Sequence, residues 1–261
     1  MRSRSYRYLL TALAVIVAGA IAFAQDQEQG REFHWKGKLA AENVVMIKNI
    51  NGDIDAEPAS GDEVEITAEK SGPEADQVKI EVVNLSDGIM VCAIYPGWFK
   101  NRCDEWHAHD SHGDKTKVHF TVKVPGNLRF EAENVNGSVD AAHMGRFVKA
   151  TSVNGSVRVS TKSWAELSTV NGSIDGSMGS VAWNGKLKAE SVNGSITLQL
   201  PENANMEVSF SSVNGRLDSD FPLTISGKFG GHSVRGTIGS GGRNLRVETV
   251  NGDVHLRKGD T

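Results

Sequence analysis

One stretch of the chain carries residue types that suit metal binding. Three histidines and four carboxylates occur in the stretch from Cys103 to Asp114, both ends included. Imidazole nitrogens and carboxylate oxygens are ligands for borderline ions such as Zn²⁺, Ni²⁺ or Cu²⁺. The spacing matches no established zinc motif and differs from the His-Glu-x-x-His motif of metallopeptidases, so a solvated histidine-rich loop is the competing interpretation. The candidate ligands are His107, His109, Asp110 and His112.

Other catalytic patterns are weaker. No Gly-x-Ser-x-Gly motif stands between an expected strand and an expected helix, and no phosphate-binding glycine loop opens a helix. Asn-Gly-Asp occurs at 51–53 and 251–253, as in calcium-binding repeats, but the residue at this position of the phrase is usually Ser or Thr. We therefore assign no catalytic residue and no cofactor, and expect a protein that is not an enzyme.

A short phrase recurs through most of the chain and must be positioned by a regular architecture. Its clearest form is Ser191-Val-Asn-Gly-Ser-Ile196, and looser copies include 49–54 and 233–238, the latter with Arg235 in place of Asn. From Asn136 onward the steps are 18, 17, 22, 21, 21 and 16 residues, which is typical of a repeat array. The repeat-turn asparagines are Asn51, Asn136, Asn154, Asn171, Asn193, Asn214 and Asn251.

Alternating apolar residues on both sides of the phrase predict strands, and Asn-Gly predicts a turn because both residues tolerate positive φ. Stacked β-hairpins with type I′ turns would place the Val or Ile before every Asn-Gly on the polar face. A solenoid, in which Asn-Gly turns a corner between two strands of one coil, allows Val192 and Ile196 both to point inward. We therefore favour a β-solenoid whose asparagines form a ladder, with stacked hairpins as the alternative.

The phrase resembles that of the bacterial putative-adhesin β-strand-repeat family, secreted proteins of mostly undefined function. The likeness runs from about Val44 to Leu256, and its specificity lies in the number of copies. It implies an all-β, right-handed parallel β-solenoid with coils of about 16–22 residues and no known catalytic centre. It also identifies the irregular stretch near residues 96–115 as a variable, disulfide-bearing loop insertion.

Residues 1–24 are expected to be a cleaved signal peptide. Three arginines precede a fifteen-residue apolar run from Leu9 to Phe23, and Ala22-Phe-Ala24 offers a small-x-small cleavage site. The run is shorter than the roughly 20 residues that span a bilayer, which argues against an uncleaved anchor. Removal of residues 1–24, with their three arginines, leaves 25 basic and 32 acidic residues, a formal charge of −7. This acidic balance argues against nucleic acid as a partner.

A disulfide is expected to close the loop insertion, because an exported protein with two cysteines is expected to join them. Free thiols or metal ligands are the alternative for Cys92 and Cys103. Aromatic residues in the same insertion either form an exposed contact surface or pack over its disulfide. These are Trp98, Phe99 and Trp106.

The remaining chain is predicted to form one β-repeat domain, residues 39–261. Residues 25–38 are predicted to be a loosely held arm whose Phe33 and Trp35 dock as an end cap. Helix signals are weak, and Ser163 to Leu167 is the one candidate for a single helical turn.

The function predicted from these features is a non-catalytic, exported, envelope-associated binding module of the adhesin type, periplasmic or extracellular. Its partner would be an envelope or cell-surface protein or glycan, because repeats build extended surfaces rather than buried clefts. One alternative is an extracytoplasmic divalent-metal-binding protein that uses the histidine-rich loop. Another is a self-assembling structural element that grows by end-to-end stacking.

Overall fold

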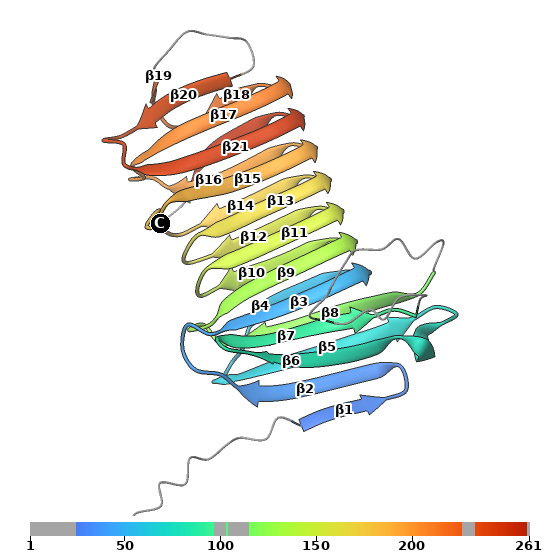
Figure 1. The fold of residues 1–261 in the computed structure, drawn as a ribbon. Helices are drawn as coiled ribbons and strands as arrows, with labels where there is room; N and C mark the ends of the chain where they lie inside the picture. The colour runs from blue at the N-terminus through green and yellow to red at the C-terminus, as the bar shows by residue number, and fades with distance from the viewer. Residues whose placement is uncertain (1–24, 97–102, 104–114, 226–232, 260–261) are drawn as a thin grey trace, which may run out of the picture.

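The computed structural model describes residues 25–96, 103, 115–225 and 233–259. Two eleven-stranded β-sheets run along an elongated stack of coils (Figure 1). Among the elements formed by the described residues, all are strands except one 3₁₀ turn, η1 (Ala75–Gln77). The all-β solenoid predicted from the repeats is confirmed.

The strands of each sheet are given in their spatial order. Sheet A contains β1 (Gln25–Gln29), β2 (Glu32–Lys38), β5 (Glu63–Ser71), β8 (Lys117–Val124), β4 (Ile54–Pro58), β10 (Val139–Met144), β12 (Val157–Thr161), β14 (Ile174–Met178), β16 (Ile196–Pro201), β22 (Val254–Gly259) and β18 (Leu217–Ser219). Sheet B contains β19 (Leu223–Ile225), β20 (Ser233–Ile238), β17 (Met206–Asn214), β21 (Arg243–Asn251), β15 (Lys186–Asn193), β13 (Ala165–Asn171), β11 (Val148–Asn154), β9 (Arg129–Asn136), β3 (Val44–Asn51), β7 (Gly88–Ile94) and β6 (Lys79–Leu85).

Each coil contributes one strand to sheet B, turns at Asn-Gly, and contributes the next strand to sheet A. β11 pairs in parallel with β9 and β13, and β12 pairs in parallel with β10 and β14. Hairpins would instead pair the two strands that flank each Asn-Gly. The upstream copy also belongs to this array, because β3 lies beside β9 with Asn51 in register with Asn136.

The core lies between the two sheets and follows from the period-two pattern of the strands. In one coil Leu187 and Ala189 point inward from β15, and Ile196, Leu198 and Leu200 point inward from β16. All five are at most 3% exposed. Full burial of such an aliphatic side chain contributes about 1.5–3 kcal/mol, so repetition along the stack stabilises an otherwise thin structure.

The last coil lies between two coils that precede it in sequence. β21 pairs in parallel with both β15 and β17, and β22 with both β16 and β18. The chain reaches this slot through β20, an antiparallel strand on the far side of β17, and a short turn. In that turn Gly239 and Gly241 have φ of 59° and 77°, in the left-handed region that favours glycine.

The strand assignments correct two predictions. The copy at 233–238 is not a solenoid corner, since Arg235 lies within β20 opposite Ser209. Ser163 to Leu167 does not form a helical turn, because β13 begins at Ala165. In both cases pairing with a neighbouring strand decides the local structure.

The opposite end of the stack is built from antiparallel strands. β2 pairs with β1 and β5, and β5 pairs with β8. Residues 25–38 are therefore not a loosely held arm. Phe33 and Trp35 of β2 are 0% and 6% exposed, so they close the core at this end.

Candidate binding surface

The six positions of the repeat phrase have different environments, which one copy illustrates. Ser191 points inward, and its hydroxyl donates to the carbonyl oxygen of Gly172 at 3.1 Å. Asn193 donates from Nδ2 to Oδ1 of Asn171 at 2.8 Å. Gly194 has no room for a side chain, since a Cβ there would lie 1.9 Å from the Gly172 oxygen. The phrase thus encodes contacts between coils.

The asparagine side chains form a ladder along the corner of the solenoid. Each amide inside the ladder donates to one neighbour and accepts from the other. This leaves its second hydrogen and second lone pair without a partner in the ladder. The six donor-to-acceptor steps, 2.8–2.9 Å long, are Asn136 to Asn51, Asn154 to Asn136, Asn171 to Asn154, Asn193 to Asn171, Asn251 to Asn193 and Asn214 to Asn251.

The asparagines themselves do not adopt positive φ, although asparagine tolerates it. In the described part of the chain, the non-glycine residues with positive φ are Glu42 and His143. The glycine is instead required by the close approach of the neighbouring coil, and at Gly194 also by a φ of 157°. Asn-Gly therefore acts as an amide rung followed by a residue without a Cβ.

The first position of the phrase places a hydroxyl inside the corner. Ser152, Thr169, Ser191 and Thr249 each donate to a glycine carbonyl of the adjacent coil at 2.8–3.1 Å. Ser212 is the exception, because its Oγ is the one buried side-chain polar atom without a partner among the described residues. These hydrogen bonds supply donors to glycine carbonyls that the tight corner would otherwise leave buried without a partner.

The valine at the second position points outward, so the prediction that Val192 faces the core is wrong. Strand alternation continues through the phrase: Ser191 faces inward, Val192 outward, and inward packing resumes at Ile196. We call the outward side chains the valine row. Its four most exposed members are Val170 at 38%, Val192 at 38%, Val250 at 39% and Val213 at 55%.

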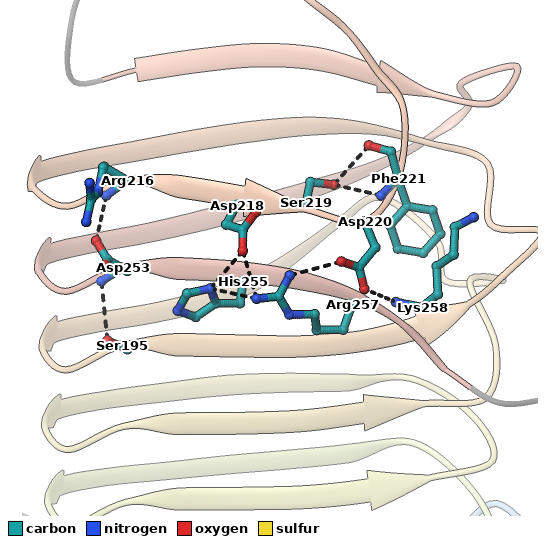
Figure 2. A network of polar contacts seen from close by, with 10 residues as sticks. All are labelled: Ser195, Arg216, Asp218, Ser219, Asp220, Phe221, Asp253, His255, Arg257 and Lys258. Carbon is teal, nitrogen blue, oxygen red and sulfur yellow. Dashed lines mark hydrogen bonds and ion pairs between the residues drawn. The ribbon is translucent and has the colours of Figure 1, made fainter.

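The outer face of sheet A carries charges that bond to one another. Figure 2 shows this at the last coils, where Arg257 bonds to Asp218 at 2.7 Å and to Asp220 at 3.0 Å. The hydrogen bond from Arg257 holds the pKa of Asp218 below its usual value. The backbone amide of Lys258 also donates to Asp220 at 3.3 Å.

This network holds a segment that crosses from sheet A to sheet B over the end of the core. Ser219 Oγ accepts from the Phe221 amide at 3.1 Å and donates to its carbonyl at 3.2 Å. Phe221 is 4% exposed and packs in the main core. Sequence reasoning missed this cap because its residues lie outside the repeat phrase and meet only through the inserted last coil.

Carboxylates elsewhere on sheet A are similarly engaged. Arg158 binds both oxygens of Asp140, at 2.6 and 2.7 Å. Asp55 lies 3.4 Å from His119. Burial raises the pKa of Asp55, His119 opposes this rise, and the nearby carboxylates Asp140 and Asp53 add to it.

Cys92 and Cys103 are joined by a disulfide with a Cα–Cα distance of 5.6 Å, which confirms the disulfide-closed insertion. Met90 and Cys92 of β7 are buried on the side of sheet B that faces away from the main core. Together with Cys103 they form a separate small apolar cluster. The disulfide therefore anchors the insertion to the outer face of sheet B.

The other predicted residues of the insertion lie outside the described residues, so their assignments stay predictions. These are Trp98, Phe99, Trp106, His107, His109, Asp110 and His112. Among the residues that are described, no group of three or more His, Cys, Asp or Glu side chains is arranged to hold a metal ion. Within the same residues, no helix has the length and apolar character needed to cross a membrane.

The solved structures to which the chain is similar include the following two. One is a "putative cell adhesion protein" from Clostridium sporogenes ATCC 15579, with 10% identity, a TM-score of 0.47, and coverage of 90% of this chain and 100% of that one. The other is a "putative adhesin" from Bacteroides fragilis NCTC 9343, with 12% identity, a TM-score of 0.39, and coverage of 88% and 98%. No match was found among curated proteins.

A family model described as Toastrack DUF4097 matches residues 100–257 and confirms the family resemblance seen in the repeats. Because this segment is more than half of the chain, the protein belongs to the Toastrack DUF4097 family.

Proposed function

We propose that this protein is an exported, non-catalytic binding module of the adhesin type that contacts an envelope component along the asparagine corner. The single observation that carries the proposal is the valine row. Among the described residues the exposed large hydrophobic side chains number five, and four of them occupy the same position of the repeat. Scattered exposed valines need no explanation, but an aligned row beside a ladder of amides does.

The corner combines apolar and polar contacts in a regular array. Adjacent rungs are separated by the strand spacing of about 4.8 Å. A partner that lies along the corner would meet valine methyl groups on one line and amide groups with unused hydrogen-bonding capacity on the next. Such a surface fits an extended polymer, either a glycan strand or an extended polypeptide. A rigid scaffold also lowers the entropy lost on binding.

Export is part of the proposal and rests on residues 1–24, whose basic and apolar segments have the pattern of a signal peptide. A disulfide between Cys92 and Cys103 fits an oxidising compartment. We place the mature protein in the periplasm or outside the cell, where envelope glycans and proteins are accessible.

The ends of the stack favour a binding module over end-to-end assembly. At one end Phe33 and Trp35 of β2 close the core, and at the other Phe221 covers it beneath the crossing segment. Covered ends limit the addition of further coils. Sedimentation velocity over a hundredfold concentration range tests this, and growth into filaments would contradict it.

The test of the proposal compares the mature protein, residues 25–261, with a variant carrying Val170→Thr, Val192→Thr and Val250→Thr. Threonine keeps the shape and strand preference of valine and removes apolar surface. Binding is measured by co-sedimentation with isolated cell-wall sacculi and by surface plasmon resonance on immobilised envelope polysaccharides. We expect the triple variant to lose at least tenfold in affinity.

The matched control is Ile225→Thr, which removes an exposed apolar residue (44%) outside the row. It should bind like the wild type, and circular dichroism should be the same for all three proteins. Equal binding by the triple variant, or no binding of the wild type to any of these materials, would overturn the proposal.

A further inference from the structure

A second surface feature lies on the outer face of sheet B. It is a concavity of about 500 Å³ over β15, β21, β17 and β20. Three of its lining residues are cationic and one is anionic, although the chain as a whole has a formal charge of −4. The side chains used below are Lys186, Ser209, Ser211, Ser233, Arg235 and Arg246.

Strand register places two arginines on either side of one serine. Ser209 of β17 is paired with Arg246 of β21 on one side and with Arg235 of β20 on the other. Paired residues on neighbouring strands point to the same face, about 4.8 Å apart. The two guanidinium groups therefore extend from positions separated by about two strand spacings, with a hydroxyl between them.

Most of these donors have no acceptor among the residues that the structure describes. Across the described chain, Arg235 and Lys186 form no ion pair, and the hydroxyls of Ser209, Ser211 and Ser233 form no side-chain hydrogen bond. Arg246 is the exception: it binds Glu248 at 2.7 Å, an interaction that raises its pKa. Glu248 thus restrains one arginine, while the donors around it remain available.

We propose that this concavity binds the carboxylate or sulfate groups of an acidic polysaccharide. Guanidinium groups form paired hydrogen bonds with planar or tetrahedral oxyanions, and serine hydroxyls complete such a site. The lining offers no exposed aromatic ring for stacking nucleic-acid bases, because Phe210 is only 5% exposed. The site goes beyond the proposed function, since its donors do not depend on the valine row having a partner.

The site also accounts for the odd copy of the repeat phrase. In seven copies the third residue is an asparagine at the corner, but in Ser233-Val-Arg-Gly-Thr-Ile238 it is Arg235. β20 runs antiparallel to β17, so this position is not at the corner and an amide rung there would have no ladder to join. An arginine at this position instead faces the concavity.

The experiment measures binding of the mature protein, residues 25–261, by isothermal titration calorimetry at low salt. The probes are a sulfated heparin-type hexasaccharide, a hexamer of galacturonate, and the neutral hexamer maltohexaose. We expect binding of at least one acidic oligomer and none of the neutral one. The double variant Arg235→Gln with Lys186→Gln should bind the acidic oligomer with a Kd at least tenfold higher than that of the wild type. Added salt should weaken binding by the wild type more than binding by this variant.

The matched control is Arg216→Gln, which removes the same charge from an exposed arginine outside the concavity and should change Kd less than twofold. Arg235→Lys keeps the charge but loses the fork of donors, so it should fall between wild type and the double variant. The two acidic probes show whether sulfate or carboxylate is preferred. Equal losses in the control and the double variant, equal binding of maltohexaose, or no binding of either acidic oligomer would overturn the proposal.

Discussion

The two outer faces of the solenoid are made from the same strand geometry but use their charges differently. On sheet A, Arg257 bonds to Asp218 and Asp220, and Arg158 bonds to Asp140 through both oxygens. On sheet B, Arg235 and Lys186 line a concavity and have no ion pair in the described residues. The polar groups of these sheet A networks therefore hold coils together, whereas the sheet B concavity keeps donors available for a ligand.

This difference predicts different consequences for substitution. Changes at the sheet A network should alter stability, because its groups bond across coils and cover the end of the core. Changes at the sheet B concavity should alter binding and leave stability nearly unchanged, because surface side chains without partners contribute little to folding.

The largest stability effect is expected for Phe221→Ala at the sheet A cap. Phe221 is 4% exposed and packs in the core, so its truncation removes buried surface and leaves a cavity. We expect a loss of about 3 kcal/mol in the free energy of unfolding, measured by urea denaturation. Ile225→Ala, 44% exposed, serves as control and should cost about 0.5 kcal/mol or less. Equal losses would show that the network does not hold a structural cap.

The cap also shows which features of the fold could not be predicted from the sequence. The repeat phrase predicted the coils, because alternating apolar residues and a short period leave few other architectures. It could not predict that 243–259 inserts between earlier coils, since every copy offers nearly the same edge to its neighbours. Arg257 meets Asp218 and Asp220 only through that insertion. The sheet A network was therefore not predictable from spacing.

The candidate surface was predicted in part. The asparagines were expected to form a ladder, but Val192 was expected to face inward and is 38% exposed. The prediction assumed that the inward-outward alternation of side chains along the strand breaks before Asn-Gly. In the structure this alternation continues as far as the asparagine, and the chain turns at the residues that follow. Arg235 was visible as a departure from the phrase, yet its position on the sheet B face depends on the antiparallel pairing of β20.

An intermediate effect is expected in the ladder that lies between the two faces. Asn193→Ala removes a rung that donates to Asn171 and accepts from Asn251, so two hydrogen bonds are lost. Asn214→Ala removes a terminal rung that only donates to Asn251. We expect a loss of about 1 kcal/mol for Asn193→Ala and about half of that for Asn214→Ala, measured by urea denaturation. A larger loss at Asn214 would contradict a ladder of equivalent rungs.

The smallest effects are expected from two aspartates of sheet A whose pKa values move in opposite directions. The pKa of Asp218 is lowered by its hydrogen bond to Arg257, so its ionised form stabilises the fold above the unfolded pKa of about 3.9. This contribution is lost as pH falls through the lower, folded pKa. Asp218→Asn should therefore reduce the melting temperature at pH 7, and the difference from wild type should disappear in strong acid.

The pKa of Asp55 is raised, chiefly by burial, so its ionised form costs stability above the folded pKa. This cost disappears once pH falls below the unfolded pKa, where the carboxyl is protonated in both states. Asp55→Asn should thus raise stability at pH 7 by about 0.5 kcal/mol or less, because the side chain is 48% exposed and water screens its charge. Thermal unfolding of both variants at pH 7 and pH 3 compares them directly. Shifts of the same sign at pH 7 would show that sheet A does not combine a stabilising carboxylate at its cap with a destabilising one further along the stack.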